Sequence, residues 1–401
     1  MNAATSVRER PRRLALRGSR LFDGRELHPG PAVVVLDGPA INAVILGSTP
    51  PADAELIDRP GATLLPGLID THVHLAFDAT ENPVATLAAR DDDAVRVAMT
   101  VAARTAVAGG VTTVRDLGDR DHLSLELRDQ PGLPRILASG PPITTFAGHC
   151  YFLGGAVADD ADAVRMAVRQ RAERGCDVVK VMTSGGTMTP GTSQEVAQFD
   201  REVLAAAVDE AHRLGLPLTA HAHGTSAIEN CIAAGVDGIE HVSFWSATGV
   251  DAPEHLMRAI AERGIVVGAT AGLLPPPPGH VPPPAVMVRM PQILANLRRL
   301  REWGAVIVAG TDAGIAPVKP HDILRTALWQ LADIGIGPLD ALRTATSVAA
   351  EVLGLGARTG RLAAGYDADV LIVDGDPLAD PDAIHRILAV YARGTQVIPE
   401  R

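Results

Sequence analysis

The feature that most constrains the fold is an alternation of short apolar segments with amphipathic segments through the middle of this 401-residue chain. The apolar segments are typical of buried parallel strands, and most precede a run with helical periodicity that stops at glycine, as in DREVLAAAVDEAHRLG. The eight expected strands are 64–74, 111–118, 135–144, 177–186, 216–224, 238–243, 265–270 and 305–314. This repetition predicts an α/β fold, a closed (β/α)8 TIM barrel. An open doubly wound sheet is the alternative, and no GxGxxG or Walker loop supports it.

The two ends of the chain have a different sequence pattern. Residues 14–65 and the stretch after Thr359 read as short strands punctuated by Gly and Pro. We therefore expect a small composite β-sandwich domain from residues 1–65 plus 355–401, next to a barrel over 66–354. The run LLPPPPGHVPPPAV (273–286), with its proline-rich part at 275–284, follows the seventh strand. We interpret it either as a solvated loop or as a lid or rim at the barrel mouth.

Composition excludes several classes of partner. The net charge of −11 argues against nucleic acid, because phosphate binding needs clustered basic side chains. No apolar run reaches the ~18 residues of a membrane span. Three cysteines give no disulfide framework, and no apolar segment follows the arginines at 8–13 to make a secretory signal. We expect a cytoplasmic protein that acts on a small molecule, and an assembly into homo-oligomers is left open.

Polar side chains collect where the expected strands end. His72 and His74 close the first strand, in DTHVH, and the same i, i+2 spacing recurs at His221 and His223. Further candidates at strand ends are His241 in IEH and Asp312 in GTD. Alternate strand residues share a face, and the carboxyl ends of barrel strands converge at one mouth. Imidazoles with a carboxylate suit zinc and similar ions, so the sequence predicts a divalent metal site.

Lys180 stands in the fourth expected strand, between two valines. An ammonium group is costly to bury there unless it is paired or neutralised. A neutral lysine amine can take up CO₂ to form a carbamate, whose two oxygens could bridge two metal ions; arginine cannot do this. Lys180 and Lys319 are the only lysines, in a chain that otherwise uses arginine. An ordinary salt-bridged lysine is the alternative for Lys180, and Lys319, in a loop, is not expected to have a bridging role.

These motifs as a set resemble the amidohydrolase superfamily over nearly the whole chain. The matching segments are PGLIDTHVH, the strand-four lysine, TAHAHG, IEHV, AGTDAG and GRLAAGYDADVLIVDGDP. KVMTSGG followed by HAHG is similar to the imidazolonepropionase-related branch, which includes Xaa-Pro dipeptidase-like enzymes. The resemblance implies a binuclear metal-dependent hydrolase with two divalent ions, expected to be zinc. Such an enzyme cleaves an amide bond, as in a dipeptide or N-acyl amino acid, by metal-activated hydroxide.

Carried over residue by residue, the resemblance also implies roles. The implied metal ligands are His72, His74, carboxylated Lys180 as the bridge, His221, His241 and Asp312. Asp312 also handles the proton, and His223 contacts the substrate carbonyl as a second catalytic residue. His149, in FAGHCYFLGG, is a further substrate-binding residue.

Other functions stay open at this stage. The same site could hydrolyse a cyclic amide, a lactone, a carbamate or another xenobiotic ester, since the metal ligands do not choose among carbonyls. A mononuclear deaminase is less favoured, because those enzymes mostly have His-x-Glu in place of the pair at 221 and 223. A non-catalytic scaffold is disfavoured by the complete set of ligands.

Overall fold

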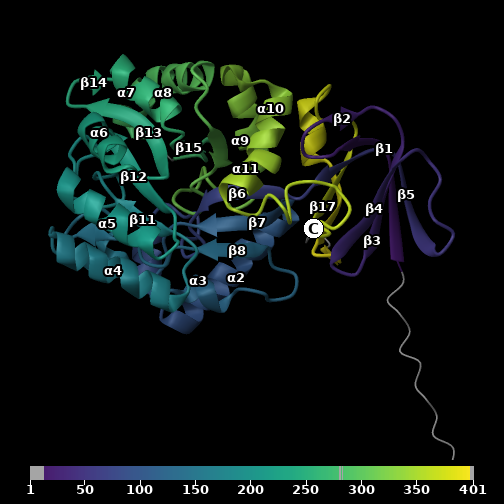
Figure 1. The fold of residues 1–401 in the computed structure, drawn as a ribbon, viewed down its shortest axis with the longest axis horizontal. Helices are drawn as coiled ribbons and strands as arrows, with labels where there is room; N and C mark the ends of the chain where they lie inside the picture. The colour runs from purple at the N-terminus through teal and green to yellow at the C-terminus, as the bar shows by residue number, and fades with distance from the viewer. Residues whose placement is uncertain (1–12, 280, 282, 398–401) are drawn as a thin grey trace, which may run out of the picture.

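The middle of the chain forms a TIM-barrel-like α/β fold in the computed structural model, which describes residues 13–279, 281 and 283–397 (Figure 1). Its parallel strands are β6 (Leu68–Val73), β7 (Val111–Asp116), β8 (Arg135–Ala138), β11 (Val179–Met182), β12 (Leu218–Gly224), β13 (Gly238–Ser246), β15 (Val266–Thr270) and β16 (Ile307–Gly310). They pair in the orders β6-β7-β8 and β11-β12-β13-β15-β16. Isolated bridges, Ile143 to Val181 and Val73 to Ala313, join these two sheets. The strands are thus not one continuous closed ladder.

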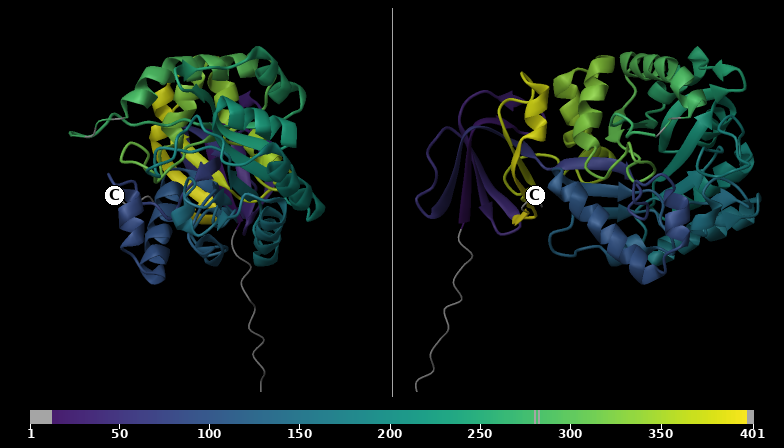
Figure 2. Two further views of the ribbon diagram at one scale, coloured as in Figure 1. Left: turned by 90° about the vertical axis from the view of Figure 1, so that its left-hand side faces the viewer. Right: turned by 180° about the vertical axis from the view of Figure 1, so that it is seen from behind.

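Helices cover the outside of these strands (Figure 2). They are α1 (Pro83–Ala88), α2 (Asp92–Ala108), α3 (Leu123–Glu126), α4 (Ala161–Arg174), α5 (Arg201–Arg213), α6 (Thr225–Ala234), α7 (Glu254–Glu262), α8 (Pro284–Glu302), α9 (Leu324–Leu331), α10 (Pro338–Thr344) and α11 (Ser347–Val352), with a π-helical turn at Ala332–Ile336. Capping side chains and glycines determine where these helices begin and end. The Asp160 carboxylate caps α4 by accepting from the backbone N–H of Ala163, and Gly175 ends it with a φ of 81°.

Both ends of the chain contribute to one further sheet. Its strands are β1 (Arg13–Phe22), β2 (Leu27–His28), β3 (Ala32–Asp37), β4 (Ala40–Leu46), β5 (Ala54–Pro66), β17 (Val370–Asp374), β18 (Ile387–Ala392) and β19 (Thr395–Val397). β5 joins the two ends, since it pairs with β1 on one side and β17 on the other. In Figure 1 the arrowheads of β7 and β8 point away from this terminal sheet. A two-layer sandwich and the domain boundaries 1–65 plus 355–401 and 66–354 stay predictions.

Two expected elements differ in extent. The strand expected at 135–144 is shorter in the structure, where β8 ends at Ala138. Pro141 and Pro142 follow, and they have no backbone N–H to donate to a neighbouring strand. In the proline-rich run, α8 begins at Pro284, where the missing N–H costs nothing in a first helical turn. Short remaining elements are β9 (Thr144–Thr145), β10 (Ala156–Val157), β14 (Gly249–Val250), and 3-10 turns at Tyr151–Leu153 and Pro381–His385.

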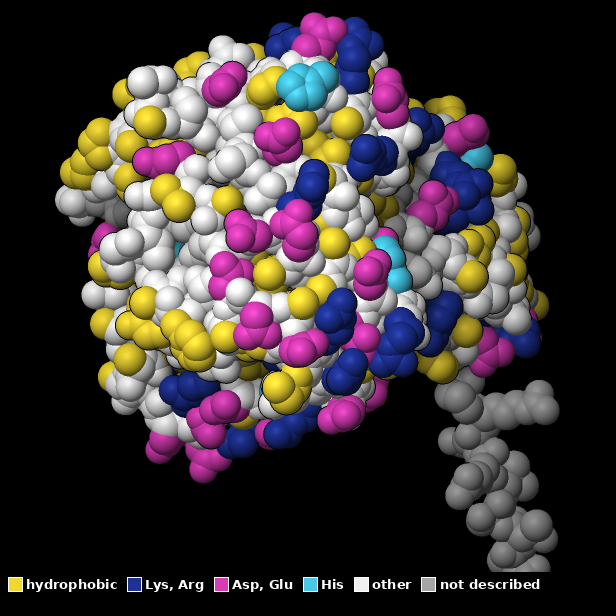
Figure 3. Space-filling model, turned by 60° about the vertical axis from the view of Figure 1, so that its left-hand side comes forward, with side chains coloured by type: hydrophobic (Ala, Val, Ile, Leu, Met, Phe, Trp, Pro, Cys, Tyr) yellow, Lys and Arg dark blue, Asp and Glu magenta, His cyan; other side chains and the backbone are white. Residues whose placement is uncertain are grey.

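The distribution of surface charge and the apolar character of the helices concern two expected absences, of nucleic-acid and of membrane partners. Acidic and basic side chains are interspersed over the face that Figure 3 presents. None of the helices within the described ranges is both long and apolar enough to cross a membrane. Most of the N-terminal arginines considered for a signal lie in residues 1–12, outside the described residues.

Candidate metal centre

The predicted site residues converge on one cavity of about 520 Å³ at the carboxyl ends of the barrel strands. They come from separate elements, and the structure brings all of them to the cavity lining: His72 and His74 from β6 and its end, His149 from the loop after β9, Lys180 from β11, His221 and His223 from β12, His241 from β13, and Asp312 just after β16. Residues more than 200 positions apart thus meet in one place, as the barrel topology predicts.

Three of these side chains form a triangle of ligand atoms. His72 Nε2 lies 3.3 Å from His74 Nε2, and Asp312 Oδ1 lies 3.4 Å and 3.2 Å from these two nitrogens. Ligands at about 2.0–2.1 Å from a tetrahedral zinc ion are about 3.3 Å apart, so the triangle has the size of one face of such a tetrahedron. The three side chains are nearly buried. Their spacing therefore fits a divalent ion.

Hydrogen bonds orient the two histidines of this triangle. His72 Nδ1 donates to Glu240 Oε2 at 2.9 Å, and His74 Nδ1 donates to the carbonyl of Gly118 at 3.1 Å. Both Nε2 atoms are thereby left with a lone pair for a metal. Glu240 is itself held by Arg115, whose Nη2 donates to Oε1 at 2.9 Å. Burial would raise the pKa of Glu240, but Arg115 and His72 outweigh it and hold the carboxyl ionised.

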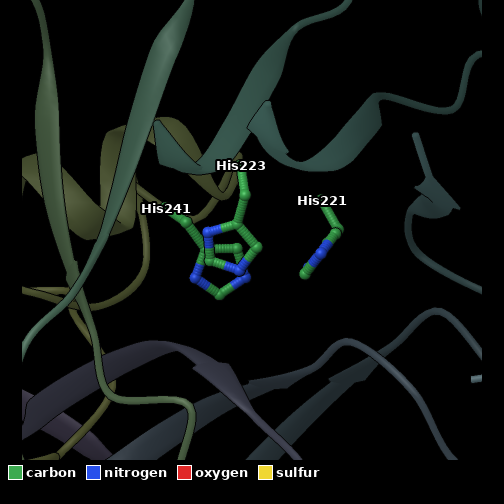
Figure 4. A group of neighbouring side chains, drawn as sticks. All are labelled: His221, His223 and His241. Atoms are coloured by element: carbon green, nitrogen blue, oxygen red, sulfur yellow. The ribbon is translucent and has the colours of Figure 1, made fainter. Parts of the chain in front are cut away.

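A second group of imidazoles comes from β12 and β13 (Figure 4). Ring centroids of His221 and His241 are 4.7 Å apart, and His223 is stacked on His241 at 4.4 Å. His221 Nε2 donates to the carbonyl of Gly185 at 3.2 Å, which leaves its Nδ1 as the available ligand atom. His223 Nδ1 is engaged with Ser243 Oγ at 2.8 Å. The three side chains could together hold an ion, because their ligand atoms lie within 4.8 Å of one another.

Lys180 lies among these groups. Its side chain is 1% exposed, and its Nζ has no hydrogen-bond partner among the described residues. Burial lowers the pKa of Lys180 to about 8, which makes the neutral amine accessible near neutral pH. A buried amine without a partner is costly in an ordinary strand. The position is therefore suited to an anionic carbamate facing cations.

Burial also keeps several histidines neutral, the form that binds metal. It lowers the pKa of His72 to about 4 and that of His223 to about 3. For His74, burial is outweighed by the hydrogen bond to Asp312, and the pKa is raised. Two candidate ligands, His241 with φ 74° and Asp312 with φ 60°, have left-handed backbone. Such strain persists where the surroundings impose it, often at functional sites.

Sequence reasoning missed or misjudged some of the site. Lys319 lies in a loop, as expected, but it is also buried on the cavity lining, with Nζ donating to the carbonyls of Thr270 at 3.2 Å and Thr311 at 2.6 Å. Glu240, the partner of His72, was not singled out; a carboxylate next to a histidine in an apolar strand was the available signal. His149 is 5% exposed, and its Nδ1 lies 3.1 Å from Thr189 Oγ1.

Residues 63–397 match the amidohydrolase family. The chain belongs to this family. It is therefore a hydrolase, of a family that acts on amide carbon–nitrogen bonds. The predicted family membership and enzyme class are confirmed.

Individual relatives agree with this assignment. The chain is 30% identical to an ochratoxinase of Aspergillus niger over 79% of this chain and 71% of the relative. It is 28% identical to an imidazolonepropionase of Rubrobacter xylanophilus, over 89% of each chain. Among solved structures, a Xaa-Pro dipeptidase with bound methionine in its active site superposes with a TM-score of 0.83 and 27% identity, covering 96% of this chain and 99% of that one.

Proposed function

We propose that the protein is a binuclear metal-dependent amidohydrolase that cleaves an amide bond of a small molecule, such as a dipeptide or N-acyl amino acid. The observation that carries the proposal is the triangle of His72, His74 and Asp312, whose sides of 3.2–3.4 Å match neighbouring ligands of one ion. Zinc is the expected ion. The similarity to a Xaa-Pro dipeptidase supports an amide as the substrate.

A second ion is supported by the remaining donors. His221 is buried and His241 partly buried, and both offer neutral imidazoles, since desolvation and neighbouring histidines lower both pKa values well below the usual range. Lys180, as a carbamate, would lie between the two groups of ligands and supply an oxygen to each ion. This assignment gives its unpartnered Nζ a role that an ordinary lysine in that strand would lack.

The other side chains act on the substrate and its protons. Two divalent ions, when bound, polarise a carbonyl and lower the pKa of a water molecule. Asp312 takes the proton of the attacking water and passes it to the leaving amine. His223, oriented by Ser243, presents Nε2 to the oxygen that becomes negative in the transition state. His149, whose ring centroid lies 4.8 Å from that of His221, binds a carbonyl or carboxylate of the substrate.

The test is amine release by zinc-loaded protein from a panel of dipeptides, N-acyl amino acids and matched esters. We expect amide hydrolysis by the wild type and none by His72→Ala, because the ion loses one of the few ligands that retain it. His212→Ala, which changes a half-exposed histidine paired with Asp237, is the control and should remain active. Full activity after exhaustive chelation would contradict the proposal.

A further inference from the structure

One wall of the cavity is an apolar helix face. On α8, Met290, Leu294 and Leu297 line the cavity at intervals of four and three residues, so they share one side of the helix. All three are only half-buried, although they are apolar and belong to a helix packed on the barrel. Leu331 and Ile334, from α9 and the π-helical turn, line the same wall. The wall thus presents apolar surface to open space.

The charges around the cavity do not complement an anionic group at this wall. No arginine is among the described residues that line the cavity, in a chain whose basic side chains are nearly all arginine. The ammonium group of Lys319 is engaged by two backbone carbonyls. Asp333, also on the lining, is a carboxylate and would repel a second anion. An anionic group could therefore be held only near the histidines.

The wall is fixed in place by Arg289, on the same helix. Its guanidinium lies 4.4 Å from the ring centroid of Trp245, which also lines the cavity, and its Nε donates to the carbonyl of Gly249 at 2.9 Å. These contacts tie α8 to the hairpin of β13 and β14. Since β13 also carries His241, the apolar wall has a defined position relative to the candidate metal centre. Binding sites that are formed in advance cost less to order.

We propose that the α8 wall is a substrate subsite for a bulky, uncharged apolar group, such as an aromatic ring system, attached on one side of the scissile amide. The proposal rests on the proposed amide hydrolysis and narrows its substrate class. The apolar group replaces water on Met290, Leu294 and Leu297, while the polar part of the substrate stays near the histidines. Burial of roughly 100 Å² more apolar surface favours the larger group by about 10²-fold.

The test compares four substrates that combine an acetyl or a 2-naphthoyl acyl group with glycine or phenylalanine as the amine. For the zinc-loaded wild type, enlarging one of these two groups, the acyl group or the amine, should raise kcat/KM by about 10²-fold. In Leu294→Glu, this gain should fall to a few-fold. Val288→Glu is the matched control, since it puts the same charge at a 79% exposed position of the same helix. An equal rate for small and large groups, or an unchanged gain in Leu294→Glu, overturns the proposal.

Binding separates failure of the subsite from failure of the proposed function. 2-Acetylnaphthalene has no scissile bond, and its binding to the zinc-loaded protein can be measured by calorimetry even if no amide is cleaved. We expect Kd to rise by about tenfold or more in Leu294→Glu and to be unchanged in Val288→Glu, in proteins with matched Tm and zinc content. Leu294→Asn is the second variant if the glutamate prevents folding. No binding by the wild type, or equal binding by all variants, overturns the proposal.

Discussion

Replacement of Lys180 by arginine tests whether its side chain is an anionic carbamate or an ordinary ammonium group. If the side chain is a carbamate, Lys180→Arg places a positive charge where the two ions require a negative one. We expect this variant to be inactive and poor in metal. Lys180→Ala should also be inactive but partly rescued by acetate or propionate, whose carboxylate can occupy the space. Activity and zinc content check both outcomes.

The control for this experiment is the same substitution at the second lysine of the chain, Lys319. Lys319→Arg keeps a cation where Lys319 already donates to two carbonyls, so it should retain its metal even if kcat falls. Near-normal activity in Lys180→Arg would defeat the carbamate hypothesis, because a guanidinium cannot bridge two cations.

Metal uptake should depend on pH through the same residue. Only the neutral amine reacts with CO₂, and the pKa of Lys180 is lowered to about 8 by burial. The rate of the reaction follows the fraction of neutral amine, so the initial rate of metal uptake by the apoprotein at constant CO₂ pressure should increase roughly 20-fold between pH 6.5 and 8.5. Lys180→Ala supplied with propionate should lack most of this increase. A flat profile in the wild type would be inconsistent with carbamate formation.

His223 tests the division between metal ligands and substrate contacts. If it steadies the developing oxyanion, His223→Ala should keep two ions and lose roughly 10²-fold in kcat/KM. The structure also allows it to be a ligand beside His221 and His241. Elemental analysis of the variant decides, since the loss of one ion would make His223 a ligand.

At the scale of elements, Glu240 on β13 couples three strands. It accepts from His72 on β6 and from Arg115 on β7, and all three side chains are buried. Glu240→Gln would remove the charge that orients His72 and balances Arg115, so metal affinity should fall about 10- to 100-fold. Competition with a chelator measures this change. Glu254→Gln, at an exposed position of α7, should leave the affinity unchanged.

Elements were predictable where one local pattern dominates. The run around Lys180 and the HAHG segment were predicted as strands because short apolar segments between helical ones are typical of buried parallel strands. Helix α8 was not anticipated, since the prolines before it read as an irregular excursion and Pro291 lies inside it. Barrel topology predicts that the candidate ligands meet at one mouth, whereas their individual roles rest on the resemblance to the family. The apolar wall could not be predicted, because which face of α8 meets the cavity depends on packing against β13 and the π-helical turn at Ala332–Ile336.

For the whole molecule, metal should contribute to stability. Purified protein is expected to hold close to two divalent ions per chain. Ions that bind only the folded state stabilise it by about 2.7 kcal/mol when free metal is a hundredfold above Kd, so chelation should lower Tm. Lys180→Arg, already poor in metal, should show little further change. A wild-type Tm that does not respond to complete metal removal would contradict this expectation.

The pairing of β5 between β1 and β17 has a consequence for synthesis on the ribosome. All candidate ligands lie between positions 72 and 312, but the strand that covers the second edge of β5 begins at Val370. About 300 residues separate the two strands, which at about 5–20 residues per second means a wait of roughly 15–60 s. During that time the apolar edge at Thr63–Pro66 lacks its native neighbour. A nascent chain could thus carry every candidate ligand and still expose a strand edge that other chains could pair with.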